Sequence, residues 1–169
     1  MPAPPQPLTV VTGGGRGIGA TTAVHLARCG HAIAVGYLDD VGSAEQVTAA
    51  ARAAGVRAVA VPGAVADEDA VAELFDIAAE LGVVTGLVNN AGLTAHLGDL
   101  ADTPVAVIRR VVEVNLVGAL LCARRVAQVM STTRGGHGGA IVNLSSAAAT
   151  LGSPHEYVHY AAAKAGSRP

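Results

Sequence analysis

Three features of the sequence predict a doubly wound α/β fold, in which helices cover both faces of a parallel sheet. Short apolar segments alternate with longer segments whose apolar residues recur at helical spacing. This alternation produces right-handed strand–helix–strand crossovers, which make neighbouring strands parallel. The glycine-rich and polar motifs each follow an expected strand, and ligands in such folds bind at the carboxyl ends of the strands. We therefore expect one layered domain with its binding site along one rim of the sheet.

The first half of the chain is expected to form strand, helix, strand, helix and strand in turn. Residues 17–29 favour the first helix, because Gly30 follows them as a typical helix stop. Ser43 and Gln46 have the spacing of a capping box, so the second helix is expected from Ser43 to about Gly55. The three expected strands are apolar and span residues 8–12, 31–37 and 57–61.

The second half continues the same alternation. Acidic residues at 67–69 favour the start of a third helix, since negative charge stabilises a helix N-terminus. Thr103 and Pro104 have the residue types of an N-cap and a first helical position, and the helix after them is expected to run to about Met130. Its buried face is apolar except at Asn115. The remaining expected segments are strands at 85–88 and 140–144 and a glycine-rich loop at 132–139.

Composition excludes several kinds of partner. The 169 residues suffice for one domain, and the net charge of −2 comes from well-mixed charges, so we expect no nucleic acid and no membrane as partner. No apolar stretch has the length of a membrane span.

Cys29 and Cys122 are too few for a disulfide framework and are expected to act as small apolar residues in a reducing, cytoplasmic protein. The proline-rich residues 1–7 are expected to form a disordered leader rather than a signal peptide.

The sequence TGGGRGIG, from Thr12 to Gly19, lies between the first expected strand and the first expected helix. Gly13, Gly17 and Gly19 would let the backbone approach a pyrophosphate at the positive end of that helix. This context favours a Rossmann-type, dinucleotide-binding domain over residues 8–169, rather than a flexible turn in a chain with 21 glycines. Because no glycine-lysine-serine/threonine sequence occurs, a P-loop nucleotidase is excluded.

Residues 155–164, HEYVHYAAAK, satisfy two catalytic patterns at once. HEYVH fits the H-E-x-x-H signature of zinc hydrolases, whereas YAAAK fits the Y-x-x-x-K core of a carbonyl-reducing enzyme. A zinc site needs both histidines on one face of a stable helix and a third protein ligand. Pro154 places His155 in a loop or first helical turn, and no candidate ligand follows His159. We therefore expect no metal and favour YAAAK, with a zinc hydrolase as a minor alternative that predicts stoichiometric bound metal.

Several motifs occur in a characteristic order along the chain. They are TGGGRGIG, NNAG at 89–92, Asn115 in VNLVG, NLSS at 143–146 and YAAAK at 160–164. Together they resemble the short-chain dehydrogenase/reductase family over essentially the whole chain after the leader. The resemblance implies an NAD(P)-dependent oxidoreductase that transfers hydride between a nicotinamide cofactor and a small-molecule carbonyl or alcohol substrate.

The resemblance also implies roles for the matched positions. Tyr160 would protonate the carbonyl oxygen or deprotonate the alcohol, Lys164 would bind the nicotinamide ribose and lower the Tyr160 pKa, and Ser146 would hydrogen-bond the substrate oxygen. Asn115 would hold a water for proton relay. The cofactor would be held by Gly13, Arg16, Gly17, Ile18, Gly19, Tyr37, Asn89, Ala91, Gly92 and Lys164.

The spacing of Tyr160 and Lys164 suits acid–base chemistry, because residues four apart stand on one face of a helix. Ionising a phenol of pKa ~10 at neutral pH costs about 4 kcal/mol. An ammonium roughly 4 Å away, at an effective dielectric constant of about 20, supplies a comparable stabilisation. Tyr157 has no lysine four residues later. Each residue also has a structural alternative: Lys164 as a solvated side chain, Ser146 as a helix cap, Asn115 as a buried amide.

Departures from the family pattern bear on the cofactor. Ala64 stands after the third expected strand, where the family usually has an acidic residue in contact with adenine, so that contact is expected to be weak. Tyr37 and Leu38 stand where an acid would select NAD. Arg16 could meet a second phosphate, so the sequence leans weakly to NADP over NAD, although two aspartates follow closely.

The family continues beyond the Y-x-x-x-K motif, whereas this sequence stops at Pro169. We therefore expect a sheet that lacks the family's C-terminal strands and exposes its fifth strand, with Tyr160 and Lys164 in a weakly anchored final turn. The homo-oligomer usual for the family becomes doubtful, and catalysis is expected to be impaired. The alternative function is a non-catalytic nucleotide-binding remnant, which would bind the cofactor without turnover.

Overall fold

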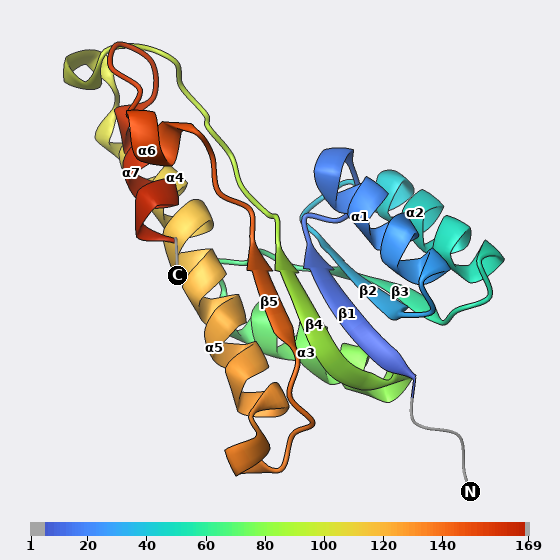
Figure 1. The fold of residues 1–169 in the computed structure, drawn as a ribbon. Coiled ribbons are helices and arrows are strands. Elements are labelled where there is room, and N and C mark those ends of the chain that lie inside the picture. The colour runs from blue at the N-terminus through green and yellow to red at the C-terminus, as the bar shows by residue number, and fades with distance from the viewer. Residues whose placement is uncertain (1–5, 168–169) are drawn as a thin grey trace, which may run out of the picture.

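The computed structural model describes residues 6–167 and confirms the predicted doubly wound α/β architecture. The strands are β1 Pro7–Thr12, β2 Ala32–Tyr37, β3 Ala58–Pro62, β4 Val83–Asn89 and β5 Ala140–Asn143. All pair in parallel, in the order β3-β2-β1-β4-β5 (Figure 1). The chain winds outward from β1 to β3 and then crosses to β4 on the other side of β1. This reversal opens a crevice at the carboxyl ends of β1 and β4, where open α/β sheets bind ligands.

Helices cover both faces of the sheet. The longer ones are α1 Gly17–Arg28, α2 Val41–Ala53, α3 Glu68–Leu81, α4 Val105–Val112, α5 Gly118–Met130 and α7 Val158–Gly166. The short elements are η1 Leu100–Asp102, η2 Glu113–Val117, η3 Thr132–Arg134 and α6 Ala148–Leu151. Helices α1 and α2 lie on one face and α3 and α5 on the other (Figure 1). Within residues 6–167, no helix is long and apolar enough to cross a membrane.

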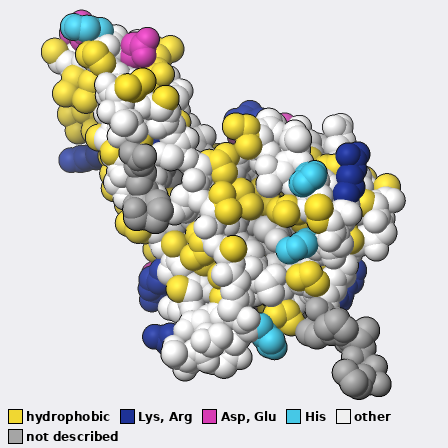
Figure 2. Space-filling model, viewed as in Figure 1, with side chains coloured by type: hydrophobic (Ala, Val, Ile, Leu, Met, Phe, Trp, Pro, Cys, Tyr) yellow, Lys and Arg dark blue, Asp and Glu magenta, His cyan; other side chains and the backbone are white. Residues whose placement is uncertain are grey.

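Neighbouring residues of a strand supply the two apolar layers, because successive side chains point to opposite faces. In β1, Val10 belongs to the layer that contains Phe75 of α3, whereas Val11 belongs to the layer with α1 and α2. Ala and Val dominate both layers, which suits close packing of helices on a sheet. Helix α7, α6 and η1 project beyond the sheet, and Figure 2 shows hydrophobic side chains gathered there. Leu97 and Leu151 are among the exposed apolar residues of that part.

The start of α2 differs from the predicted capping box. Asp40 is the N-cap, and its carboxylate accepts hydrogen bonds from the Ser43 hydroxyl (2.7 Å) and the Ser43 amide (2.9 Å). These bonds hold the pKa of Asp40 below its ordinary value. The prediction of Ser43 as the cap was wrong, because an acceptor three residues earlier already satisfies its amide.

The long helix predicted after Thr103 continues to Met130, but it contains the π-helical segment η2 around Asn115. Pro104 rather than Thr103 is its N-cap residue. The Thr103 hydroxyl instead donates to the carbonyl of Asp99 (2.9 Å) in the preceding turn. π-helical turns inside longer helices occur often at functional sites. The position of η2 therefore agrees with Asn115 as a candidate functional residue.

The two cysteines differ in environment. Cys122 is fully buried, and burial raises the pKa of its thiol to about 12, so it behaves as the predicted small apolar residue. Cys29 is exposed at the C-cap of α1, so the same prediction was wrong there.

Both terminal segments were only partly predicted. Residues 1–5 of the expected leader lie outside the described residues, and Pro7 is the first residue of β1. β5 forms an edge of the described sheet, as predicted, and Val142 is 52% exposed. Helix α7 runs to Gly166, and Lys164 within it is only 5% exposed. The prediction that Lys164 lies in a weakly anchored turn was therefore wrong.

Candidate active site

The glycine-rich turn after β1 forms a cradle of bare backbone. Gly13 has a φ of +60°, and a Cβ there would lie 2.9 Å from the Cα of Ala91. A Cβ at Gly19 would lie 2.4 Å from the side-chain nitrogen of Asn90 and 2.7 Å from the carbonyl oxygen of Gly13. Glycine is therefore required at both positions, because any side chain would collide with the loop that follows β4.

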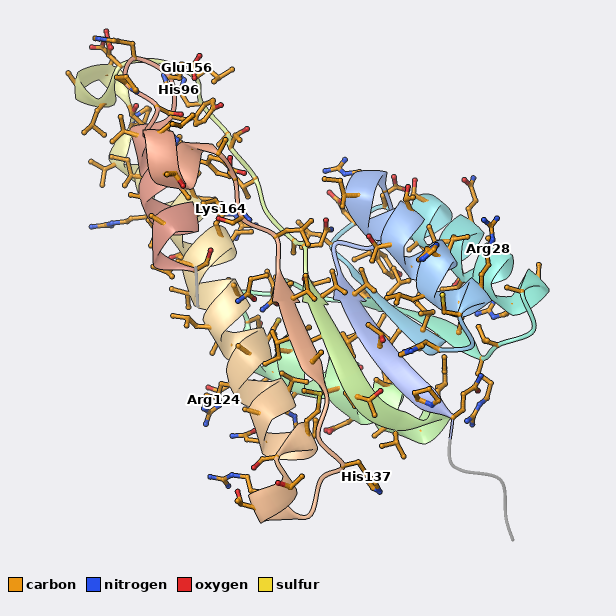
Figure 3. The ribbon with its side chains drawn as sticks, viewed as in Figure 1. Arg28, His96, Arg124, His137, Glu156 and Lys164 are labelled. Carbon is orange, nitrogen blue, oxygen red and sulfur yellow. The ribbon has the colours of Figure 1, made fainter. Side chains whose placement is uncertain are left out.

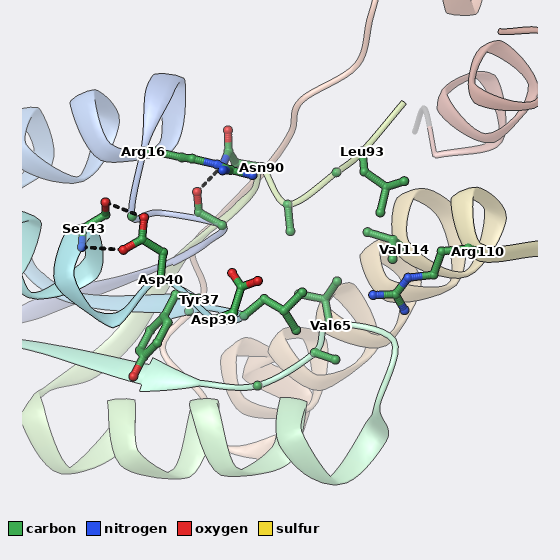
Figure 4. A pocket seen from close by; sticks show the side chains of 18 residues that line it. Arg16, Tyr37, Asp39, Asp40, Ser43, Val65, Asn90, Leu93, Arg110 and Val114 are labelled. Carbon is green, nitrogen blue, oxygen red and sulfur yellow. Dashed lines mark hydrogen bonds between the residues drawn. The ribbon is translucent and has the colours of Figure 1, made fainter. Parts of the chain in front are cut away.

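A cavity of about 380 Å³ opens beside this cradle, at the carboxyl ends of the central strands (Figure 4). Its size lies within the range of small-molecule sites. The expected cofactor residues that line it are Gly13, Arg16, Tyr37, Ala91 and Gly92. Lining residues that the sequence did not suggest as ligands include Asp39, Asp40 and Ser43 near the start of α2, Asn90 and Leu93 after β4, and Arg110 and Val114 on α4 and η2. The cavity is thus bounded by the glycine turn, the end of β2 and the loop after β4.

Other expected cofactor residues lie outside the lining of the cavity. Gly17 begins α1 with a φ of +55°, Ile18 is 67% exposed, and Gly19 is buried where α1 approaches Asn90. Gly17 and Gly19 shape the turn, since the first lies in the left-handed region and the second permits close approach.

Two adjacent asparagines after β4 have different environments. Asn89 is 5% exposed, and its amide donates to the side chain of Asn143 on β5 (2.9 Å) and to an α5 carbonyl (3.1 Å). Both amide hydrogens of Asn89 are therefore used inside the protein, which does not support it as a cofactor ligand. Asn90 lines the cavity and donates to the carbonyls of Thr12 (2.9 Å) and Gly13 (2.8 Å). Asn90 thus fixes the glycine turn.

Thr12, the last residue of β1, completes this junction. It is 1% exposed, and its hydroxyl oxygen accepts hydrogen bonds from the amides of Asn90 and Ala91, both at 3.1 Å. The sequence contains the signal for both residues, a threonine before the glycines and a second asparagine in NNAG. Only the pairing of β1 with β4 brings them into contact.

Tyr160 and Lys164 stand one turn apart on α7, and Lys164 points toward the end of β5 (Figure 3). The Lys164 Nζ donates to the carbonyl of Leu144 (2.8 Å) and lies 5.9 Å from the centre of the Tyr160 ring. A Cβ added to Gly92 would lie 3.4 Å from the same Nζ. The ammonium therefore lies near both the Tyr160 ring and Gly92, which lines the cavity. Since Lys164 is buried, the solvated-lysine alternative is wrong. Burial lowers the pKa of Lys164.

Replacing Lys164 by Met is expected to change how stability depends on pH. The folded-state pKa of Lys164 is lowered, so between this pKa and that of the unfolded chain the unfolded state binds more protons. Wild-type stability therefore rises with pH in that interval. Relative to Lys164→Met, the free energy of unfolding of the wild type should therefore increase as the pH rises from the lowered pKa of Lys164 toward the ordinary lysine value of about 10.4. Urea unfolding of both proteins across this range measures the difference, and a constant or falling difference would contradict a buried charge.

Asn115, at the centre of η2, is 1% exposed. Its side-chain nitrogen donates to the carbonyls of Leu93 (2.7 Å) and Val111 (2.9 Å), and its side-chain oxygen accepts from the Leu93 amide (3.3 Å). Both amide hydrogens are committed, so a relay water at this residue can take no hydrogen from the side chain. The buried-amide alternative describes this side chain, which fixes the loop that lines the cavity.

Ser146 is half-buried at the start of α6. Its hydroxyl oxygen accepts a hydrogen bond from the Ala148 amide (3.2 Å), which uses a lone pair and not the hydroxyl hydrogen. The N-cap residue of α6 is Ala147, so Ser146 is not the cap itself, and its bond to Ala148 leaves its hydroxyl hydrogen free to be donated. Ser145 is exposed, and its hydroxyl donates instead to the carbonyl of Lys164 (3.5 Å).

The HEYVH segment does not meet the requirement of a zinc site. His155 precedes α7, has a φ of +62°, and contacts the carboxylate of Asp99 through Nδ1 (2.5 Å). His159 lies within α7, is 4% exposed, and places Nε2 3.2 Å from the carbonyl oxygen of Thr94. The two imidazoles therefore face different partners and do not share a helix face. Tyr157 packs edge-on against Tyr160, with ring centres 5.4 Å apart.

Comparisons with known proteins agree with this geometry. The family model described as short chain dehydrogenase matches residues 7–168. The chain is 40% identical over 158 residues to the uncharacterized oxidoreductase YgfF of Escherichia coli (strain K12), a match that covers 93% of this chain and 64% of the relative. It is 43% identical over 160 residues to cis-4-hydroxycyclohexanecarboxylate dehydrogenase of Sinomonas cyclohexanicum, covering 94% of this chain and 62% of the relative.

Solved structures give the same result. The structure of NAD⁺-bound xylitol dehydrogenase matches with a TM-score of 0.85 at 31% identity, covering 95% of this chain and 60% of that one. A short chain dehydrogenase from Burkholderia cenocepacia J2315 in complex with NADP matches with a TM-score of 0.84 at 34% identity, covering 94% and 63%. The chain thus spans less than two thirds of the length of these relatives. Since the family model covers nearly the whole chain, this protein belongs to the short-chain dehydrogenase family.

Proposed function

We propose that this protein is an oxidoreductase that transfers hydride between NAD or NADP and a small-molecule carbonyl or alcohol. One observation carries the proposal. Tyr160 and the buried Lys164 stand one helical turn apart, with the ammonium facing Gly92 at the wall of the cavity. This arrangement supports an acid–base role for the two residues beside a cavity that is large enough for part of a dinucleotide.

The residues around the cavity fit a dinucleotide. Gly13 and Gly19 let the turn, the start of α1 and the loop after β4 approach more closely than any Cβ would allow, and the first amides of α1 receive no side-chain cap at the same turn. We assign the pyrophosphate to this turn and the nicotinamide end to Gly92 and Lys164. The bound cofactor would supply or accept the hydride. Arg16 favours NADP, whereas the carboxylate of Asp39 in the cavity favours the free ribose hydroxyls of NAD, so both cofactors are proposed.

Residues of this chain would exchange the proton with the substrate oxygen. Tyr160 donates it to the carbonyl oxygen in reduction and takes it back in oxidation. The buried ammonium of Lys164, one helical turn after Tyr160, would bind the ribose at the nicotinamide end of the cofactor. The free hydroxyl hydrogen of Ser146 can bond the substrate oxygen. Asn115 acts indirectly, by holding Leu93 at the cavity wall.

Titration of the protein with NADH and with NADPH, followed by calorimetry, tests the binding half of the proposal. We expect a dissociation constant between about 1 μM and 1 mM for at least one of them. The ratio of the two dissociation constants shows whether Arg16 or Asp39 has the larger effect on the choice of cofactor. Consumption of the reduced cofactor in the presence of a panel of aldehydes and ketones tests the catalytic half. Binding without turnover would favour the non-catalytic alternative, and failure to bind either cofactor would overturn both.

A further inference from the structure

The two histidines of HEYVH contact one and the same segment of the chain, residues 94–99, which follows β4. His159 Nε2 lies 3.2 Å from the carbonyl oxygen of Thr94, and His155 Nδ1 lies 2.5 Å from the Asp99 carboxylate. Between them, the amide of Gly98 donates to a carbonyl in the same approach to α7, that of Glu156 (2.7 Å). Figure 1 shows the two segments side by side where the molecule projects beyond the sheet. We call these three contacts the clasp.

The contact of His159 with Thr94, the inner contact, is buried, whereas the contact of His155 with Asp99, the outer contact, is exposed. His159 is 4% exposed, whereas the side chains of His155 and Asp99 are 84% and 55% exposed. Because the Thr94 carbonyl can only accept, Nε2 of His159 must carry the hydrogen. The other ring nitrogen, Nδ1, is buried without a partner among residues 6–167. The bond to Thr94 is therefore the side-chain hydrogen bond that His159 makes within residues 6–167.

The backbone has an unusual conformation on both sides of the clasp. Ala95 and His155 have φ values of +58° and +62°, and they are the non-glycine residues with positive φ in the described chain. One lies on each side of the clasp. Residues other than glycine adopt this conformation only where the surroundings hold them, and such residues cluster at active sites and ligand clamps.

The clasp also has a defined relation to the catalytic helix. His159 immediately precedes Tyr160, so the segment that it holds is fixed relative to the acid–base tyrosine. At its other end the segment continues from Leu93, which Asn115 holds from η2. Residues 93–99 therefore link η2, through Leu93, to α7, through Thr94.

We propose that His159 is a positioning residue that fastens residues 94–99 to α7 through Thr94 and makes them a preformed wall for the substrate beside Tyr160. The role as a substrate wall rests on the proposed oxidoreductase function. The clasp itself does not. The histidine pair of HEYVH is thus used for holding a loop.

Two substitutions of His159 separate the two ring nitrogens. In His159→Gln the amide nitrogen can reach the place of Nε2 and donate to Thr94, whereas in His159→Asn it can reach only the place of the unpartnered Nδ1. The amide of Gly98, which lies inside the clasp, is the reporter. We expect its hydrogen exchange to be about tenfold faster in His159→Asn and within about threefold of wild type in His159→Gln. His155→Gln, which alters the exposed outer contact, should change it less than about threefold.

Equal exchange of Gly98 in wild type and His159→Asn would overturn the clasp, as would an increase spread evenly over β1 and β4, since that would indicate global destabilisation. With turnover, His159→Asn should raise KM for the carbonyl about fivefold with kcat and cofactor affinity little changed, and His159→Gln should restore it. An unchanged KM would overturn the role as a substrate wall. If the wild type binds cofactor but turns over no carbonyl, the proposed function fails for this chain, and the exchange of Gly98 decides the clasp by itself.

Discussion

Replacement of Tyr160 by Phe is expected to lower the rate of hydride transfer at least about 100-fold. The change removes the only atom that exchanges a proton with the substrate oxygen in the proposed mechanism and leaves the ring in place. The ring's contacts with Tyr157 and Lys164 should persist, so the free energy of unfolding and the affinity for NADH or NADPH should change little. Single-turnover absorbance of the reduced cofactor, with affinity measured separately by calorimetry, distinguishes the two effects.

Tyr157→Phe is the matched control. Tyr157 is the N-cap residue of α7 and packs on the same ring, but Ala161 stands one turn after it in place of a lysine. We expect the rate of this variant to stay within about threefold of wild type. Equal losses in both variants would show that the rate depends on packing of the aromatic pair and would remove Tyr160 from the role of acid and base.

Gly19→Ala is expected to weaken NAD(P)H binding at least about tenfold and to lower the free energy of unfolding by about 1–3 kcal/mol. The added Cβ would collide with the Asn90 side chain at 2.4 Å and with the Gly13 carbonyl at 2.7 Å. A carbonyl of the main chain cannot rotate away, so α1 must move from the β4 loop and the cradle must open. Urea unfolding and calorimetric titration of the variant measure the two losses.

Gly42→Ala provides a comparison in another helix start. Gly42 is the second residue of α2, and a Cβ there would meet only the Asp40 carboxylate, at an ordinary 3.7 Å. Alanine is favoured over glycine in helices, so stability should be unchanged or higher by about 0.5 kcal/mol, with unaltered cofactor affinity. If Gly19→Ala behaved like Gly42→Ala, the close approach of α1 to Asn90 would not matter for binding.

Much of the fold could be predicted from the sequence because its signals are local. Apolar strands and amphipathic helices alternate, and parallel crossovers follow from that alternation. The cap of α2 was mispredicted because Asp40 and Ser43 are both good cap residues. The backbone begins the helix at Val41, which makes Asp40 the N-cap residue. The π-helical turn at Asn115 was not predicted, and there the Asn115 side chain bonds both Val111 in the preceding turn and Leu93 in the loop after β4.

The site was predictable where residues act within one element and not where strands bring them together. Tyr160 and Lys164 lie within one helix, so the Y-x-x-x-K pattern and the family resemblance sufficed to predict the pair. Asn89 and Asn90 are adjacent, and the sequence cannot say which points to the cavity and which to β5. The histidines at 155 and 159 match a metal signature, but Pro154 predicts that His155 lies before the stable part of the helix, and α7 indeed begins only at Val158.

The central position of β1 has a consequence for the order in which this chain can fold. β1 pairs with β2 from the adjoining part of the sequence but also with β4, which follows only after two further helices. Contacts between distant parts of a chain form late, because closing long loops is entropically unfavourable. Thr12 and Gly13 meet Asn90 only when β4 has docked. A nascent chain that has formed only the first strand–helix–strand unit therefore has the glycine turn without its contacts to Asn90. A cofactor can bind at the completed turn only after β4 has paired with β1.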